Sequence, residues 1–242
     1  DLGDYAAALE FFRQSERLCR ELGDPDILQH CLLNQATLLL TQNLLDPAMR
    51  LLKEHEAVCR ASGDRKGLLA SLCDQAIILR RQGKLDDAER MLLEHEQMCR
   101  DMAFPEAMAL NLINRGHILR IRRKFDQALD AFGQAEEISR KLGNLRGAEV
   151  ALGNRAHVME DRMDNESALR LRDQQEKLCR ELDIPLVLVQ CLLKKAELLG
   201  VPMGRPKEAK PLVNEAVELA KKLDLDWLMK EAQKVGVAVS MA

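Results

Sequence analysis

Alanine recurs at a nearly constant interval along this chain, and such a period limits the fold to an array of similar units. The recurring alanines are Ala8, Ala48, Ala88, Ala128, Ala168 and Ala209, spaced by 40 residues four times and then by 41. Glutamate keeps the same step at Glu16, Glu56, Glu96, Glu136 and Glu176, and arginine keeps it at Arg20, Arg60, Arg100, Arg140 and Arg180. A further column of small residues holds Ala36, Ala76, Gly116, Ala156 and Ala196. Chance does not align this many columns, so the chain contains an internal repeat.

Each period contains two predicted helices. Leu68, Leu72, Ala76 and Leu79 recur at spacings of four and three, which places them on one face of a helix. The pattern breaks at Gly83, and a second apolar face begins at Leu85. Because a single helix pair cannot bury both of its apolar faces, neighbouring pairs must stack.

Proline and glycine mark the predicted helix ends. Prolines stand where a helix can begin, at Pro25, Pro105 and Pro185. Glycines stand just past the end of a helix, where a left-handed backbone is easiest for glycine, at Gly23, Gly63 and Gly143. The predicted elements are a lone helix at 4–22, helix pairs at 25–61, 65–102, 105–142, 145–182 and 185–223, and a terminal helix at 226–239. We expect an all-α solenoid that forms one domain over residues 1–242, within a longer protein.

Composition supports close helix packing and a reducing environment. Aromatic residues make up only 3% of the chain, so leucine and alanine must fill the core. No apolar run approaches the roughly 18 residues of a membrane-spanning helix, so no membrane segment is predicted. The seven cysteines are an odd number without a Cys-x-x-Cys pair, which argues against disulfides and zinc and predicts buried packing residues. We therefore expect a cytoplasmic protein, with the nucleus as an alternative.

The repeat resembles the tetratricopeptide repeat in its long form. The resemblance is carried by Leu2-Gly3-Asp4-Tyr5-Ala6-Ala7-Ala8-Leu9 and by Gln82-Gly83-Lys84-Leu85-Asp86-Asp87-Ala88-Glu89, which have the turn glycine, acidic residues and alanine of that family. The period of 40 residues is similar to that of kinesin light chains, of Leu-Gly-Asn-repeat scaffolds and of sensor regions in bacterial signalling ATPases. The resemblance implies a right-handed α-solenoid of antiparallel helix pairs, which acts as a scaffold or regulatory module and binds a peptide or helix of a partner protein in its concave groove.

The resemblance also implies a binding surface on the first helix of each pair, which lines the inner wall. Two positions before the small residue, where the family often has a peptide-binding asparagine, this chain has Asn34, Asp74, Asn114, Asn154 and Lys194. The next column, where the family usually has leucine, holds Gln35, Gln75, Arg115, Arg155 and Lys195. Amides can bridge the backbone of a peptide, and cations suit carboxylates. The predicted peptide-binding residues are Asn34, Asp74, Asn114, Arg115, Asn154, Arg155, Lys194 and Lys195. The alternative is that these polar residues only keep the inner surface hydrated.

The distribution of charge indicates what kind of partner this surface favours. The predicted first helices carry a small excess of basic residues and the second helices a small excess of acidic ones, although the net charge is only −3. A basic inner wall favours an acidic or phosphorylated protein or peptide.

No catalytic motif accompanies the repeats. The sequence contains no glycine-rich phosphate loop, no nucleophile elbow and no His-Glu-x-x-His motif, so we expect a non-enzymatic scaffold without cofactor or metal. Two other functions stay open, a sensor region of a larger signalling ATPase and, less favoured, an RNA-binding solenoid. The basic run at residues 120–124 is confined to one turn, whereas RNA binding needs a stripe along many repeats. Self-association is left open.

Overall fold

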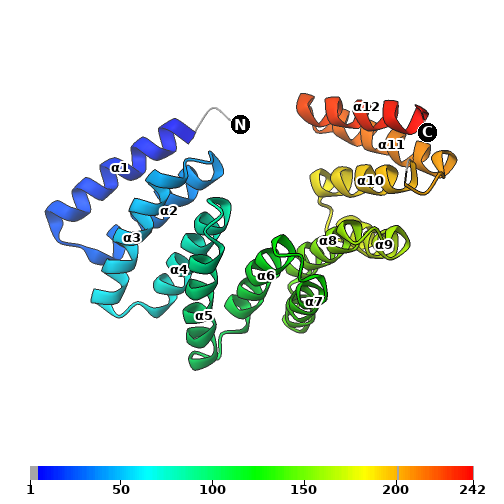
Figure 1. Cartoon of the computed structure of the whole chain (residues 1–242). Helices are drawn as coiled ribbons and strands as arrows, with labels where there is room; N and C mark the ends of the chain where they lie inside the picture. Colours follow the sequence, from blue (N-terminus) through cyan, green and yellow to red (C-terminus); the bar gives the residue numbers. More distant parts are fainter. Residues whose placement is uncertain (1–4, 201, 242) are drawn as a thin grey trace. The chain divides into compact units, whose positions relative to one another are not determined.

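A computed structural model describes residues 5–200 and 202–241, and these residues form helices and turns without a strand (Figure 1). The helices are α1 (Tyr5–Leu22), α2 (Pro25–Thr41), α3 (Leu45–Ser62), α4 (Arg65–Arg81), α5 (Leu85–Asp101), α6 (Pro105–Ile121), α7 (Phe125–Lys141), α8 (Leu145–Asp161), α9 (Asn165–Glu181), α10 (Pro185–Gly200), α11 (Pro206–Lys222) and α12 (Asp226–Met241). Their bounds lie close to the predicted ranges. Asp4, the predicted start of the first helix, lies outside the described residues.

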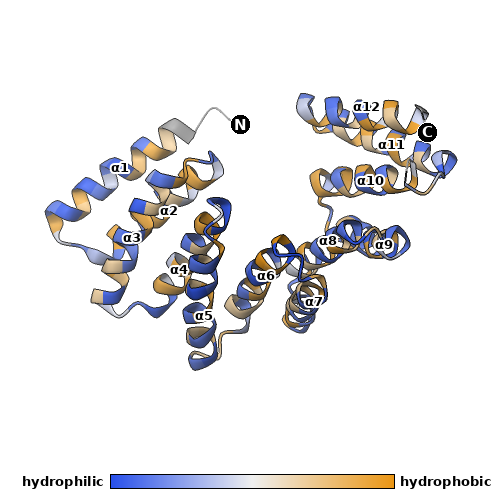
Figure 2. Cartoon of the chain, viewed as in Figure 1, coloured by the Kyte–Doolittle hydropathy of each residue, from blue (hydrophilic) through white to orange (hydrophobic). Residues whose placement is uncertain are grey.

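The described residues divide into two compact units. The first ends at Ile118, near the end of α6, and the second begins at Leu119. In the first unit α1 to α5 pack against one another in succession, and in the second unit α7 to α12 do so. Each described helix carries both polar and apolar residues (Figure 2).

The turns share one backbone conformation. Each described turn contains a single residue in the left-handed region, which is glycine at Gly23, Gly63 and Gly143, as predicted. Gly83 and Gly204 also adopt this conformation, and at the remaining described turns a non-glycine residue such as Asn43 does so. The three predicted prolines are the first residues of α2, α6 and α10.

The recurring alanines lie in the core. The alanines spaced by 40 or 41 residues are completely buried at Ala48, Ala88, Ala128, Ala168 and Ala209. The core is a series of small clusters, such as Ala36, Leu52 and Ile78 in the first unit, because each repeat buries apolar surface mainly against its neighbours.

The last helix covers one end of the second unit. Leu228, Ala232 and Val235 of α12 are buried in the cluster formed with α10 and α11. Trp227 of the same helix is exposed. No helix in the described part of the chain combines the length and hydropathy needed to cross a membrane.

Candidate functional site

The column of predicted cations is engaged within the chain. In every repeat the side chain at this position donates a hydrogen bond to the glutamate nineteen residues earlier, on the preceding helix. The pairs are Gln35 with Glu16, Gln75 with Glu56, Arg115 with Glu96, Arg155 with Glu136 and Lys195 with Glu176. The same glutamates also pair with the arginine four residues later. The recurring glutamates therefore form a series of hydrogen bonds and ion pairs that connect successive helices.

The pair of Lys195 with Glu176 shifts the pKa of its carboxylate. Burial alone would raise the pKa of Glu176, but the hydrogen bonds from Lys195 and Arg180 outweigh it and lower that pKa. Lys195 is itself buried, and its nitrogen lies 2.5 Å from Glu176 and 2.6 Å from Asp173. A partner carboxylate would have to compete with these internal ones, so a binding role for Arg115, Arg155 and Lys195 stays a prediction.

In the first unit, the asparagine column varies in exposure. Asn34 is exposed, whereas Asn114 is buried and donates a hydrogen bond to Cys73 Sγ at 3.3 Å. Asp74 is half-buried, and burial raises its pKa to about 6.

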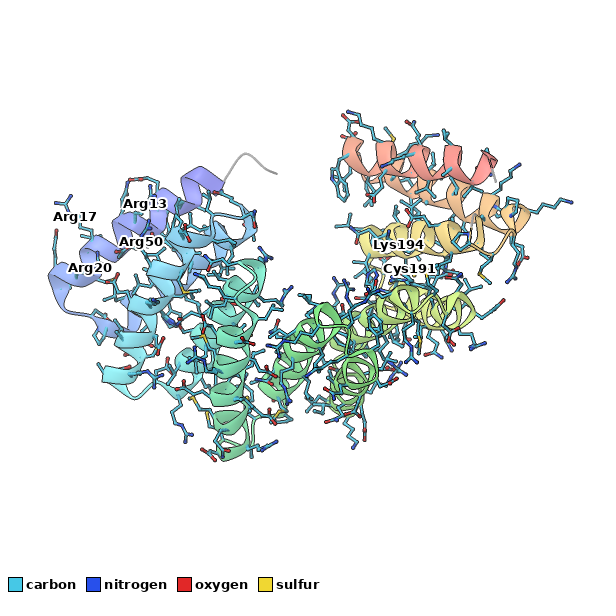
Figure 3. All side chains as sticks on the ribbon, in the orientation of Figure 1. Arg13, Arg17, Arg20, Arg50, Cys191 and Lys194 are labelled. Carbon is cyan, nitrogen blue, oxygen red and sulfur yellow. The ribbon has the colours of Figure 1, made fainter. Side chains whose placement is uncertain are left out.

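In the second unit, the same column contributes to a groove. Asn154 of α8 and Lys194 of α10 both line a groove of about 370 Å³, which we call the α8–α10 groove. Its wall on α8 includes Val150 and its wall on α10 includes Gln190. Lys194 and Cys191 lie on the side of α10 toward α8 and α9 (Figure 3).

The floor of the α8–α10 groove is a buried polar network centred on Arg172 of α9. Only 3% of Arg172 is exposed. Its guanidinium donates to Glu160 Oε1 at 2.9 and 3.0 Å and to Gln175 Oε1 at 2.8 Å. The Nδ1 atom of His157 lies 3.0 Å from the same guanidinium and 3.0 Å from Glu160 Oε2. Paired charges of this kind hold the floor in one arrangement.

The network continues from Gln175 to a second buried carboxylate. Gln175 donates to Glu149 Oε1 at 2.7 Å, and Glu149 is only 2% exposed. Gly153 makes room for this contact, because a Cβ atom at that position would lie 2.6 Å from the Gln175 amide nitrogen. The other carboxylate oxygen, Oε2, lies 3.1 Å from a guanidinium nitrogen of Arg146 but accepts no hydrogen bond.

The protonation of Glu160 follows from its neighbours. Burial acts to raise the pKa of Glu160, but the hydrogen bond with His157 and the charge of Arg172 outweigh burial and lower it. Glu160 is therefore ionised at neutral pH and balances the buried guanidinium.

The sequence analysis did not identify the residues of the floor, although a comparison of the repeats shows that two positions of the floor differ from their counterparts. The column of Arg172 is otherwise apolar, with Leu52, Leu92, Phe132 and Val213. The column of Gly153 otherwise holds Leu33, Cys73, Ile113 and Leu193. A buried position that changes from apolar to charged in one repeat only is the feature that marks this groove.

The groove walls carry amides that are free to bind. The Asn154 and Gln190 side chains make no hydrogen bond within the described part of the chain, whereas Lys194 pairs with Glu197 at 2.6 Å. An amide can both donate to and accept from a peptide backbone. The groove therefore offers hydrogen bonds from both walls above a floor that is already paired.

The cysteines are packing residues, as predicted. All seven are buried, and none forms a disulfide. Burial raises the pKa of Cys59 and Cys99 to about 11 and that of Cys73, Cys179 and Cys191 to about 12, so these thiols stay protonated near neutral pH. Within residues 5–200 and 202–241, no three histidine, cysteine or acidic side chains are placed together to hold a metal ion.

The fold is that of tetratricopeptide-repeat proteins, and it is shared with several solved structures. BtubC (BKLC) from P. vanneervenii superposes with a TM-score of 0.76 at 17% identity, covering 91% of this chain and 92% of that one. A signal transduction ATPase with numerous domains from Pyrococcus horikoshii, which has a tetratricopeptide repeat sensor, matches with a TM-score of 0.75 at 13% identity. That match covers 99% of this chain but only 36% of the ATPase.

A third solved structure holds a bound partner. A Rap protein complexed with competence and sporulation factor has a TM-score of 0.72 at 13% identity, and the match covers 98% of this chain and 71% of that one. No protein-family model and no curated protein matches the sequence. The similarity confirms the predicted all-α solenoid of the tetratricopeptide type at the level of fold.

Proposed function

From the tetratricopeptide-type fold of this chain, we propose that it is a non-enzymatic protein-interaction module. It binds an extended segment of a partner protein in the α8–α10 groove. The observation that carries the proposal is the pair of unbonded amides, Asn154 and Gln190, on opposite walls above a buried, paired floor. The unpaired thiols fit a reducing compartment, the cytoplasm or the nucleus.

The physical argument is preorganisation. A floor whose charges are already paired does not need to rearrange when a ligand arrives, so less binding energy is lost in ordering the site. The Rap protein is an example of a similar fold with a bound partner, since its structure was solved in complex with competence and sporulation factor.

We extend the proposal to the other predicted peptide-binding residues, and we treat the two units separately. In the first unit, Asn34, Asp74 and Asn114 would contact the partner, and in the second unit Asn154 and Lys194 would do so. The cations Arg115, Arg155 and Lys195 would add an acidic or phosphorylated preference only where a ligand displaces their internal glutamates.

The test is selection of peptides from a displayed library by the full chain, followed by affinity measurement on variants. Asn154→Ala should weaken the binding of a selected peptide by about 1–3 kcal/mol, because it removes hydrogen bonds made in a partly desolvated groove. Gln174→Ala, an exposed residue of α9, is the matched control and should leave affinity unchanged. Thermal melting of both variants should agree with the native chain within the small range of surface substitutions.

Equal affinity of the native chain and a folded Asn154→Ala variant would contradict the proposal. Selection of no peptide at all would contradict it as well.

A sensor region of a larger signalling ATPase is the second candidate. It is favoured by the match to the Pyrococcus horikoshii ATPase, in which this chain spans about a third of the protein. A nucleotide-binding domain in the same full-length protein would support this candidate, and its absence would remove it.

A further inference from the structure

Two neighbouring grooves of the first unit lie between successive second helices. The α1–α3 groove, of about 380 Å³, includes Arg13, Arg17 and Arg50 in its lining. The α3–α5 groove, of about 590 Å³, includes Arg50, Lys53 and Lys84. Because Arg50 of α3 lines both, the two grooves form one surface with cations along it.

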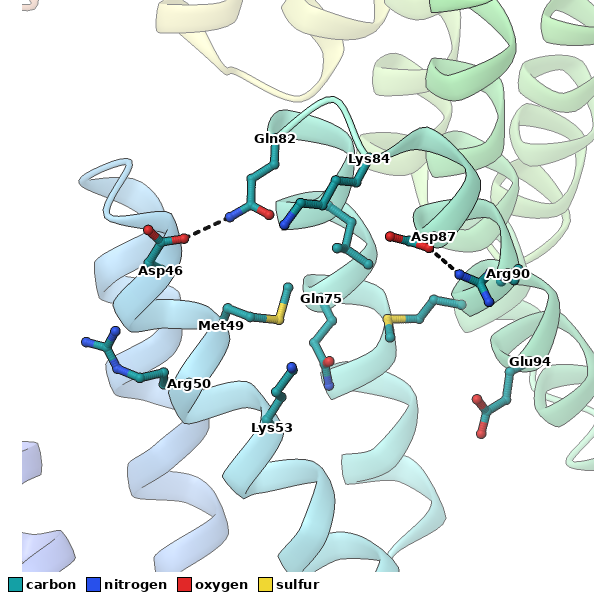
Figure 4. A pocket seen from close by; sticks show the side chains of 12 residues that line it. Asp46, Met49, Arg50, Lys53, Gln75, Gln82, Lys84, Asp87, Arg90 and Glu94 are labelled. Atoms are coloured by element: carbon teal, nitrogen blue, oxygen red, sulfur yellow. Dashed lines mark hydrogen bonds and ion pairs between the residues drawn. The ribbon is translucent and has the colours of Figure 1, made fainter.

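The carboxylates of this surface are already engaged. Glu16 pairs with Arg20, Asp46 accepts from Gln82 at 2.9 Å, and Glu94 accepts from Arg60 at 2.7 Å. Asp87 pairs with Arg90. Figure 4 shows the contacts of Asp46 and Asp87 within the α3–α5 groove.

Four of the cations, by contrast, have no partner in the described part of the chain. These are Arg13, Arg50, Lys53 and Lys84, whose side chains make no ion pair or hydrogen bond with the described residues. Lys53 and Lys84 point into the α3–α5 groove, and Arg50 points to the other side of α3 (Figure 4). Arg13 and Arg17 follow one another along α1 (Figure 3). Positive charge is therefore left unbalanced along this surface.

The repeat does not require these cations. The column that holds Arg13 and Lys53 continues as Leu93, Gly133, Asp173 and Asn214, so basic residues occur there only in the first unit. Packing of the fold tolerates other residue types at these positions. The positive charge is therefore a local property of this surface.

Apolar side chains also line both grooves. Met49, Leu79 and Met91 line the α3–α5 groove, and Leu39 and Leu51 line the α1–α3 groove. Methionine adapts its shape to different apolar side chains. A ligand for this surface thus needs both anionic groups and apolar side chains.

We propose that this surface binds an acidic amphipathic peptide segment of a partner protein, as a second interaction surface separate from the α8–α10 groove. Glutamate or aspartate side chains of the segment would pair with Arg13, Arg50, Lys53 and Lys84, and its apolar side chains would enter the grooves. A nucleic acid fits less well, because none of the described residues that line the grooves is aromatic and able to stack on a base, and the apolar lining side chains would have no counterpart on a phosphate backbone.

The test uses fluorescence anisotropy of the full chain with a labelled synthetic peptide built from repeated Glu-Glu-Leu-Glu-Met units. Replacing Arg13, Arg50, Lys53 and Lys84 together by glutamine should weaken binding by at least about tenfold, since charge-assisted hydrogen bonds are lost. The matched control replaces Lys207, Lys210, Lys230 and Lys234 by glutamine, exposed residues of the second unit. It changes the net charge equally and should alter binding by less than about twofold, because diffuse attraction is screened by salt.

Four outcomes would overturn this proposal. They are no saturable binding of the peptide, equal loss in both variants, equal binding of a peptide with glutamine in place of glutamate, and tighter binding of labelled single-stranded oligouridine RNA. Asn154→Ala should leave the affinity for the acidic peptide unchanged, so failure of this proposal is distinguishable from failure of the peptide groove in the second unit.

Discussion

Replacing Arg172 with leucine is expected to lower the free energy of unfolding by about 3–5 kcal/mol, the cost of breaking a buried charge network by removing one partner. Leucine occupies the same column at Leu52 and Leu92, so its size and helix propensity are compatible with the position. The loss comes instead from Glu160 and Gln175, which keep their burial but lose the guanidinium.

The loss should depend on pH in a defined direction. The charge of Arg172 helps to lower the pKa of Glu160 in the folded chain, and the stability gained from this is present above the pKa of the unfolded chain. As the pH falls through the folded-state pKa, Glu160 becomes protonated and this contribution disappears. The difference between Arg172→Leu and the native chain should therefore be largest near neutral pH and shrink in acid, as measured by urea unfolding.

A triple variant separates stability from binding. Changing Glu160, Arg172 and Gln175 together to leucine removes the guanidinium and both groups that accept its hydrogen bonds, and such replacements by apolar residues are often neutral or stabilising. We expect the triple variant to recover most of the stability lost in Arg172→Leu but to bind a groove-selected peptide poorly. A triple variant that binds as well as the native chain would show that the floor serves folding alone.

Asp74→Asn is expected to stabilise the chain at neutral pH by up to about 3 kcal/mol, the equivalent of a pKa raised from 3.8 to about 6. Burial penalises the ionised carboxylate of Asp74, which has no hydrogen bond or ion pair within the described residues. Asparagine avoids the charge, and the column already holds it at Asn34, Asn114 and Asn154.

The pH profile identifies the cause. Because the folded-state pKa of Asp74 is raised, the folded chain binds more protons than the unfolded chain between pH 3.8 and about 6, and native stability falls across this window. The advantage of Asp74→Asn should be absent near the lower end and complete above the upper end, in denaturant titrations at several pH values. Asp130→Asn, an exposed control, should change stability by less than about 0.5 kcal/mol. A gain that is the same at all pH values would contradict the electrostatic cause.

The fold could be predicted because its determinants are local and repeated. The columns of Ala48 and Ala36 have to be small wherever helices approach closely, and Pro25 and Gly63 act on the helix ends beside them. Because the repeat occurs several times, the small residues, prolines and glycines that mark these places could be compared within a single sequence.

The candidate site could be predicted only in part. The asparagine column led to Asn154 and Lys194, which line the α8–α10 groove. The neighbouring cations were assigned to a partner, whereas Arg115 meets Glu96 nineteen residues away on the preceding helix. Both columns were visible in the sequence, but their contact depends on how successive helices are rotated against each other. Arg172 could not be found from the columns in which all repeats agree, because it occupies a position that is apolar in the other repeats.

The most direct test of the proposed partner-binding groove is photo-crosslinking from its wall. A photoreactive p-benzoylphenylalanine would replace Val150 of α8 in the full chain, and the same residue at Gln174 of α9 would serve as control. A library-selected peptide should crosslink at position 150, lose this crosslink when unlabelled peptide competes, and crosslink little at position 174. Equal crosslinking at both positions, or none at position 150 by a peptide that still binds the chain, would contradict partner binding in the α8–α10 groove.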